Sequence, residues 1–174
     1  MPRPIEEQRK RRREYMHKYR KGIIGYAFVV GDLLHYGHLH FLNECKKHCD
    51  FLIVGVYTDE LTKTYKRRPI IPFEERIELI RNLKPVDMVV VVHNRNATLM
   101  LKKLMDDNWK VQCLFHGTDW DLEADKDLMK SKKFIESIGG KLIQPEYYKG
   151  TTTTRIIKDI VERYKSGENV IGEQ

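Results

Sequence analysis

The chain has 174 residues, of which 41% are hydrophobic and 33% are charged, a balance typical of one soluble globular domain with a single core. No apolar run reaches the roughly 18 residues that a membrane-spanning helix needs, and the N-terminus lacks the apolar core of a secretory signal. The three cysteines are an odd number without C-x-x-C spacing. This number and spacing indicate buried, reduced thiols rather than disulfides or a metal site. Because cysteines stay reduced in the cytoplasm, we expect a cytoplasmic protein.

The net charge of +7 is concentrated in residues 1–21, which carry nine basic and three acidic side chains, so that the rest of the chain is nearly neutral. We interpret this segment as a basic arm. Its sparse apolar positions are typical of a solvated arm or of a helix packed on a partner subunit. Contact with an anionic membrane or with nucleic acid is the alternative. Residues 22–165 form the predicted domain, and residues 166–174 form a loose tail.

Strand and helix patterns alternate five times along the predicted domain. Each strand is a short apolar run, and each helix has apolar residues at three- and four-residue spacing. The predicted strands are 23–30, 50–56, 86–92, 111–115 and 141–144, and the helices are 37–48, 72–83, 97–107, 127–138 and 152–165, with a short helical turn at 58–60. This alternation predicts an α/β fold in which a doubly wound five-stranded parallel sheet carries helices on both faces.

Two histidines and a glycine stand where the first predicted strand turns into the first predicted helix, in the sequence His35-Tyr36-Gly37-His38. In a parallel sheet that junction lies at the carboxyl ends of the strands, where ligands bind. The N–H groups of a helix start favour phosphate, and Gly37 lets a phosphate approach the backbone. The histidines can stabilise charge on phosphoryl oxygens. A histidine that merely caps the helix is the alternative.

A second phosphate-binding pattern precedes the last predicted helix, where Gly150 is followed by Thr151–Thr154 and Arg155. Hydroxyl and N–H groups at a helix start can bind phosphate as well as cap the helix. An ordinary N-cap is the alternative, but four successive threonines exceed what one cap needs. Arg155 adds a fixed positive charge with a geometry suited to phosphate.

With both motifs present, the chain resembles the cytidylyltransferase family of the H-x-G-H nucleotidyltransferases, and within it the glycerol-3-phosphate cytidylyltransferase branch. The matching segments keep the family's order over about residues 23–163. They are Asp32–His38, the helix start Pro72–Arg76, Val86-Asp87, Gly117-Thr118-Asp119-Trp120 and Gly150–Thr154. The resemblance implies a Rossmann-like nucleotidyltransferase that transfers CMP from CTP to a phosphorylated alcohol with Mg²⁺. The products would be pyrophosphate and a CDP-alcohol, a precursor of phospholipids or the cell envelope.

The resemblance also implies roles for residues at matching positions, and it implies a homodimer. His35 and His38 would stabilise the transition state at the α-phosphate of CTP. Lys66 and Arg67 would draw in the phosphate of the acceptor. The nucleotide-binding residues implied, besides the two histidines, are Val30, Gly31, Asp32, Gly37, Lys84, Gly117, Asp119, Trp120, Thr151, Thr152, Thr153 and Thr154.

Four positions depart from the family pattern. Val29 and Tyr147 stand where glycine and arginine are usual, Lys84 stands where a related arginine is common, and Tyr65 stands where the glycerol-phosphate branch has a lysine. The acceptor therefore stays open between a glycerol-phosphate-like alcohol, choline or ethanolamine phosphate, and a phosphonate. The alternative enzyme is an adenylyltransferase acting on FMN or another phosphorylated cofactor, because H-x-G-H serves both nucleotides. A further alternative is that the protein is not an enzyme but an inactive module that binds nucleotide or nucleic acid.

Overall fold

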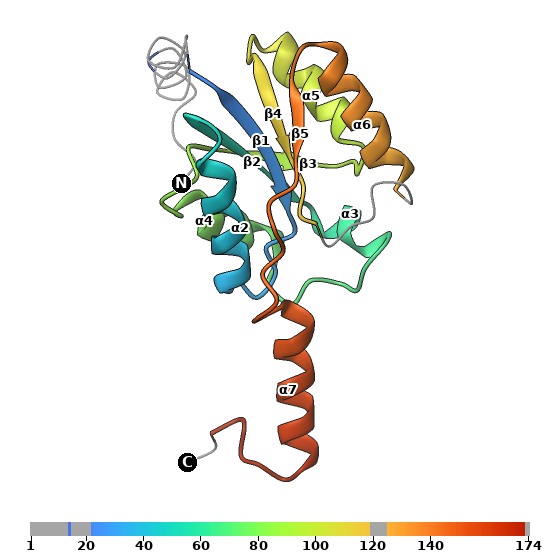
Figure 1. Ribbon diagram of the computed structural model, residues 1–174. Helices are drawn as coiled ribbons and strands as arrows, with labels where there is room; N and C mark the ends of the chain where they lie inside the picture. The colour runs from blue at the N-terminus through green and yellow to red at the C-terminus, as the bar shows by residue number, and fades with distance from the viewer. Residues whose placement is uncertain (1–13, 15–21, 119–124, 173–174) are drawn as a thin grey trace.

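A wholly parallel five-stranded sheet forms the centre of the computed structural model, which describes residues 14, 22–118 and 125–172 (Figure 1). The strand order is β3-β2-β1-β4-β5. The bounds are β1 (Ile24–Val29), β2 (Phe51–Tyr57), β3 (Met88–Val92), β4 (Val111–Phe115) and β5 (Lys141–Ile143). The predicted sheet is confirmed. Its topological switch point lies between β1 and β4, where doubly wound sheets bind ligands.

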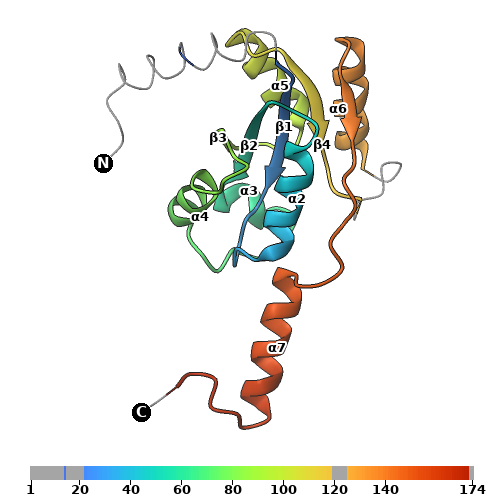
Figure 2. The same ribbon diagram turned by 60° about the vertical axis from the view of Figure 1, so that its left-hand side comes forward.

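Helices join successive strands and cover both faces of the sheet (Figures 1 and 2). They are α2 (Tyr36–Lys46), α3 (Asp59–Lys63), α4 (Phe73–Arg81), α5 (Ala97–Asp106), α6 (Lys126–Ser137) and α7 (Thr153–Lys165). The five long helices begin and end within two residues of the predicted bounds, and α3 extends the predicted turn. Within the described ranges, no helix has the length and apolar character needed to cross a membrane.

The central strands are buried on both faces because their side chains alternate between two helical layers. In β2, Ile53 packs with α5 and α6 in one core cluster, whereas Leu52 and Val54 pack with α2 and α4 in the other. All seven residues of β2 are buried, which explains its continuous apolar run. Each fully buried aliphatic side chain stabilises the fold by roughly 1.5–3 kcal/mol.

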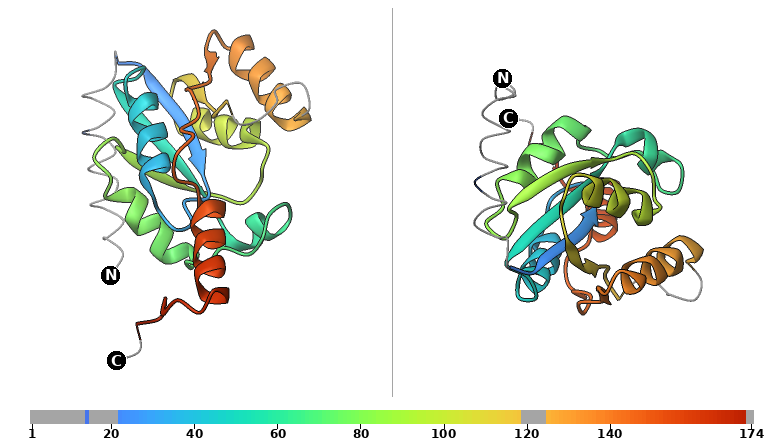
Figure 3. Two further views of the ribbon diagram at one scale, coloured as in Figure 1. Left: turned by 60° about the horizontal axis from the view of Figure 1, so that its bottom comes forward. Right: turned by 90° about the horizontal axis from the view of Figure 1, so that it is seen from above.

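Helix α7 extends away from the sheet, beyond the carboxyl ends of the strands (Figures 1 and 3). It contains no buried residue, and its apolar side chains Ile160, Val161 and Tyr164 are 49%, 43% and 63% exposed. The helix is thus attached to the domain mainly through its first turn, which belongs to the candidate site. The basic arm, apart from Glu14, lies outside the described residues.

Candidate functional site

A cavity of about 600 Å³ lies at the carboxyl ends of the strands, and its volume is typical of small-molecule sites. All five strands contribute to it through residues at or beyond their last positions. These residues include Val30 after β1, Tyr57 at the end of β2, Arg95 after β3, His116 after β4 and Glu146 after β5. The fold therefore brings together segments from the whole domain at the edge where parallel sheets bind ligands.

The two histidines of the H-x-G-H motif are held in one tautomer by backbone hydrogen bonds. Nδ1 of His35 accepts the N–H of Gly37 at 3.0 Å, and Nδ1 of His38 accepts the N–H of His35 at 3.4 Å. Because a neutral imidazole carries a single proton, both rings hold it on Nε2. The ring centroids are 4.0 Å apart, so two Nε2–H donors lie side by side in the cavity wall.

Both histidines are neutral near pH 7. Burial lowers the pKa of His35 below its ordinary value. Burial, together with the neighbouring His35, lowers the pKa of His38 to about 4. The histidines therefore act as uncharged hydrogen-bond donors in the unliganded protein. Lys66 and Arg67, which line the same cavity, supply positive charge beside them.

The threonine loop packs directly against the histidine turn. Oγ1 of Thr153 donates to the carbonyl oxygen of Asp32 at 2.9 Å and lies 3.3 Å from Nε2 of His35, from which it accepts. A Cβ at position 37 would lie 2.9 Å from the carbonyl oxygen of Thr151, so Gly37 permits this approach of the two loops. The two motifs therefore form one continuous surface.

Thr152 is the N-cap of helix α7. Its Oγ1 accepts the N–H of Arg155 at 3.1 Å, as the ordinary N-cap interpretation predicts. The first turn of α7 lies at the cavity, since Thr151, Thr152, Thr153 and Thr154 all line it. Arg155 is exposed and is not among the lining residues. The N-terminus of α7 thus offers the cavity backbone N–H groups, the positive end of the helix dipole and hydroxyl groups.

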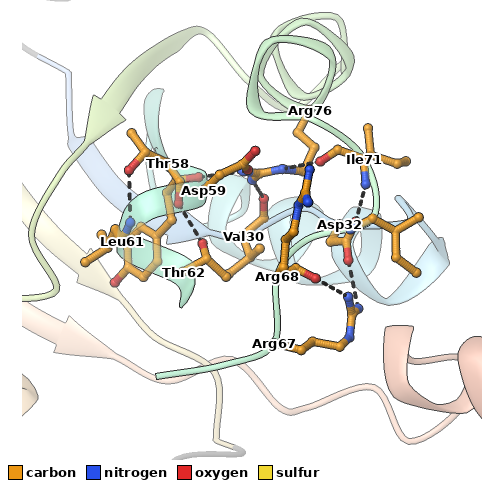
Figure 4. Close-up of polar contacts among 12 residues, drawn as sticks. Val30, Asp32, Thr58, Asp59, Leu61, Thr62, Arg67, Arg68, Ile71 and Arg76 are labelled. Atoms are coloured by element: carbon orange, nitrogen blue, oxygen red, sulfur yellow. Dashed lines mark hydrogen bonds and ion pairs between the residues drawn. The ribbon is translucent and has the colours of Figure 1, made fainter. Parts of the chain in front are cut away.

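Asp32 anchors residues 64–71, here called the basic loop (Figure 4). Its Oδ1 accepts the N–H groups of Ile70 and Ile71, each at 3.0 Å, and its Oδ2 accepts Nη2 of Arg67 at 2.7 Å. Burial alone would raise the pKa of Asp32, but these hydrogen bonds and the charge of Arg67 lower it. The ionised carboxylate is committed to the basic loop, whereas the sequence predicted a nucleotide-binding role for Asp32.

Arg76 of α4 joins the ends of two strands to the basic loop, and its side chain is fully buried (Figure 4). It donates to the carbonyl oxygens of Val30, of Tyr57 at 2.9 Å and of Ile71 at 3.0 Å, and it pairs with Asp59 at 2.6 Å. A buried charge is costly unless it is paired and hydrogen-bonded, and these partners meet that requirement. Arg76 therefore fixes the floor of the cavity.

The end of the cavity beside β2 is aromatic, and we call Phe28, Tyr57 and Tyr65 the aromatic wall. The rings of Phe28 and Tyr57 are stacked with centroids 5.7 Å apart. Tyr65 meets Tyr57 edge-on at 6.1 Å. The guanidinium carbon of Arg95 lies 4.4 Å from the centroid of Tyr65, and Arg95 pairs with Asp125 at 3.3 Å. The cavity thus has one end lined by hydrogen-bond donors and cations and another end lined by aromatic rings.

Most of the residues that the sequence proposed for the site lie together. Those that line the cavity are Val30, Asp32, His35, Gly37, His38, Lys66, Arg67, Gly117, Thr151, Thr152, Thr153 and Thr154. Gly31 lies in the same turn with a φ of +72°, in the left-handed region that favours glycine. Asp119 and Trp120 fall outside the described residues.

Lys84 requires a correction, because its position conflicts with the predicted nucleotide-binding role. It is exposed and follows α4, on the connection that leads into the amino end of β3. In a parallel sheet this connection must lie at the edge opposite the cavity. Lys84 accordingly is not among the residues that line the cavity.

The cavity also contains residues to which the sequence analysis gave no role, among them Tyr57, Arg95, Asp125 and Ser131. Arg95 follows β3 directly, in a short polar segment, so its place at a strand's carboxyl end was a usable signal. Asp125 caps α6 through its Oδ1, which accepts the N–H groups of Asp127 and Leu128. Asp125 and Ser131 reach the cavity because of how α5 and α6 pack, which the sequence pattern does not show.

Comparisons with known proteins agree with this geometry. Residues 30–159, which include both motifs, match the family model described as cytidylyltransferase-like. The FAD synthase of Thermococcus kodakarensis is 34% identical over 153 residues, covering 86% of this chain and 99% of that protein. The FAD synthase of Methanopyrus kandleri is 31% identical over 143 residues, covering 80% and 92%.

Two further similarities concern other proteins. The bifunctional protein HldE of Granulibacter bethesdensis is 32% identical over 139 residues, which are 79% of this chain but 27% of that protein. The chain therefore corresponds to about a quarter of HldE. The crystal structure of a lipopolysaccharide core biosynthesis protein from Thermoplasma volcanium matches with a TM-score of 0.58 and 28% identity, covering 75% of this chain and 99% of that one.

Proposed function

The chain belongs to the cytidylyltransferase-like family, and from this we propose that it is an adenylyltransferase, which transfers AMP from ATP to FMN and releases FAD and pyrophosphate. Nucleotidyl transfer is the activity class of this family. The observation that carries the finer proposal is the similarity to FAD synthases over 92% and 99% of their lengths. This favours the adenylyltransferase alternative over the CTP-dependent reaction with a glycerol-phosphate-like alcohol.

The end of the cavity that the histidines and the threonine loop line is our candidate phosphate-binding end, and it fits in-line transfer without a covalent enzyme intermediate. A phosphate oxygen of FMN forms a bond to the α-phosphorus of ATP. The bond from that phosphorus to the bridging oxygen breaks, and its electron pair leaves with pyrophosphate. Such a reaction needs positioning and charge stabilisation rather than a nucleophile on the enzyme. Hydrogen-bond donors and cations line this end of the cavity, and they suit a reaction that needs no nucleophile on the enzyme.

Each part of this end has a task in the proposed reaction. The Nε2–H group of His38 donates to the oxygens on which charge develops at the α-phosphate. His35 lies beside it, and its own Nε2–H is donated to Thr153, which keeps the threonine loop against the histidine turn. The N-cap Thr152 and the first turn of α7 hold the β- and γ-phosphates. Lys66 and Arg67 attract the acceptor's phosphate and offset the repulsion between the two anions. Because the acceptor and nucleotide are both anionic, the neutral histidines alone would not suffice.

Mg²⁺ fits the proposal as the counter-ion of the triphosphate, since Mg²⁺ is commonly held by substrate phosphates with few protein ligands. When bound, it supplies additional neutralisation of phosphate charge. Asp32 does not fit as its ligand, because its carboxylate oxygens accept the N–H groups of Ile70 and Ile71 and the guanidinium of Arg67.

Cytidylyl transfer is the second candidate, supported by the motif Gly117-Thr118-Asp119-Trp120. Pyrophosphate release should be measured for the full chain with ATP or CTP, each combined with FMN or glycerol 3-phosphate, and FAD should be identified by chromatography. We expect turnover with ATP and FMN, and loss of it in His38→Ala. Preferential turnover of CTP with glycerol 3-phosphate would overturn the adenylyltransferase proposal.

A further inference from the structure

Tyr65 lies next to the cations that serve the acceptor's phosphate. It directly precedes Lys66 and Arg67 in the basic loop, and all three residues line the cavity. An acceptor whose phosphate is held by these cations must place its remaining atoms nearby. The aromatic wall of Phe28, Tyr57 and Tyr65 is therefore within reach of the acceptor's non-phosphate portion.

Three neighbours contact the ring of Tyr65, and one of them is Lys66, whose Nζ lies 5.7 Å from the ring centroid. The guanidinium of Arg95 lies over it, 4.4 Å from the ring centroid, and Tyr57 packs against it edge-on at 6.1 Å. Burial raises the pKa of its hydroxyl to about 12, so the phenol is neutral. A rigid, uncharged ring thus stands beside two cations, and it brings no negative charge to an approaching phosphate.

Helix α6 supports this arrangement through Asp125. One carboxylate oxygen caps the helix by accepting the N–H groups of Asp127 at 2.9 Å and Leu128 at 3.0 Å. The other oxygen pairs with Arg95 at 3.3 Å, and Arg95 covers Tyr65. Asp125 at the start of α6 therefore holds Arg95, and Arg95 in turn holds the ring of Tyr65. Arg95 is thus a positioning residue for Tyr65.

We propose that Tyr65 determines acceptor specificity, and that the aromatic wall is the subsite for a flat aromatic group on a phosphomonoester. The inference rests on the proposed nucleotidyl transfer but not on the identity of the nucleotide. Aromatic rings gain most from stacked or edge-on contact with other rings, whereas a small polyol has hydroxyl groups that need hydrogen-bond partners. The wall thus favours aromatic over polyol phosphates.

Steady-state kinetics with ATP and FMN on Tyr65→Ala, Tyr65→Phe and wild type test the proposal. We expect Tyr65→Ala to raise the KM for FMN about tenfold or more, with the KM for ATP and kcat changed less than about threefold. Tyr65→Phe should remain near wild type, because it keeps the ring. Tyr164→Ala, on the exposed face of α7, is the matched control and should leave both KM values unchanged.

Binding of FMN without ATP, followed by the polarisation of flavin fluorescence, gives an independent measurement of the Kd for FMN. Tyr65→Ala should raise this Kd about tenfold or more, and Tyr65→Phe should leave it near the wild-type value because the ring is kept. If thermal melting shows that Tyr65→Ala is unfolded, Tyr65→Leu takes its place and should show the same increase in KM. Equal increases in the KM for FMN and for ATP would overturn the proposal.

A panel of acceptors separates this proposal from the proposed function. The panel comprises FMN, pyridoxal 5′-phosphate and glycerol 3-phosphate, each with ATP and CTP. Turnover of pyridoxal 5′-phosphate instead of FMN, with a KM that rises in Tyr65→Ala, would reject FAD synthesis and support the aromatic subsite. Preferred turnover of glycerol 3-phosphate, with a KM unchanged in Tyr65→Ala, would overturn the subsite.

Discussion

The hydroxyl of Thr153 lies 3.3 Å from Nε2 of His35, although 118 positions separate the two residues in the sequence. The same hydroxyl donates to the carbonyl oxygen of Asp32 at 2.9 Å. With Nδ1 of His35 accepting the N–H of Gly37, the imidazole is hydrogen-bonded at both nitrogens. The start of α7 therefore orients a histidine at the start of α2, and a substitution at Thr153 should affect both the histidine turn and the threonine loop.

Replacing Thr153 by valine should weaken nucleotide binding and lower kcat, each by about fivefold, because two hydrogen bonds of ordinary net strength are lost, one to Asp32 and one to His35. Thr153→Ser keeps the hydroxyl and should remain near wild type. Titration calorimetry with ATP and steady-state kinetics on both variants provide the comparison. If the serine variant is impaired as strongly as the valine variant, the hydroxyl is not the orienting group.

His38→Ala should lower kcat by roughly 100- to 1,000-fold, as expected for loss of one preorganised donor. The nucleotide Kd should change much less, because the donor acts chiefly on charge that develops in the transition state. Single-turnover rates and melting temperatures should be measured on the same preparation. His48→Ala removes an exposed histidine and serves as the control. A stable His38→Ala with normal turnover would refute the catalytic assignment.

Arg76→Met should destabilise the fold by about 3–5 kcal/mol, because it leaves Asp59 without its buried partner and strand-end carbonyls without donors. The matched control is Arg81→Met on the same helix, whose pair with Glu78 is exposed on both sides and is expected to contribute about 0–1 kcal/mol. Urea unfolding of both variants measures the difference. Equally small decreases in the free energy of unfolding in the two variants would show that Arg76 does not secure the strand ends.

The stability of the fold should fall as the pH decreases from about 6.5 towards 4. The pKa of His38 is about 4 in the fold, against roughly 6.5 in the unfolded chain, so the unfolded state binds a proton more readily over this interval. Linkage gives a loss of about 2 kcal/mol at pH 5 relative to pH 7.5. The lowered pKa of His35 acts in the same direction.

The variant that isolates this effect is His38→Gln. Its free energy of unfolding should fall less than that of wild type between pH 7.5 and pH 5, by about the same 2 kcal/mol. Urea titrations at both pH values give the four free energies needed. Parallel losses in the two proteins would mean that His38 titrates normally in the fold.

A chain that begins at Gly22 should retain kcat within about twofold of the full chain, because the basic charge of residues 1–21 is separate from the motifs that line the cavity. Pyrophosphate release provides the rate, and gel filtration shows whether both chains have the same association state. A large loss of kcat in a folded chain of unchanged association state would indicate that the arm contributes to the site.

The sequence by itself determined the elements and their class. Burial along β2 and the apolar spacing of α4 are properties of single segments, so periodicity is sufficient to identify them. The alternation of strand and helix then requires crossovers and a parallel sheet. The positions of His35, His38 and Thr152 at helix starts were also predictable, because strand-to-helix turns in such a sheet lie at its ligand-binding edge.

Only the tertiary structure decided which of these segments touch. The contact of Thr153 with His35, the commitment of Asp32 to the basic loop and the position of Lys84 all depend on strand order and on how connections cross the sheet. The aromatic wall likewise combines rings from β1, β2 and the basic loop. Local patterns encode burial and capping within a segment, whereas contacts between distant segments arise from packing the whole core, which no single segment specifies.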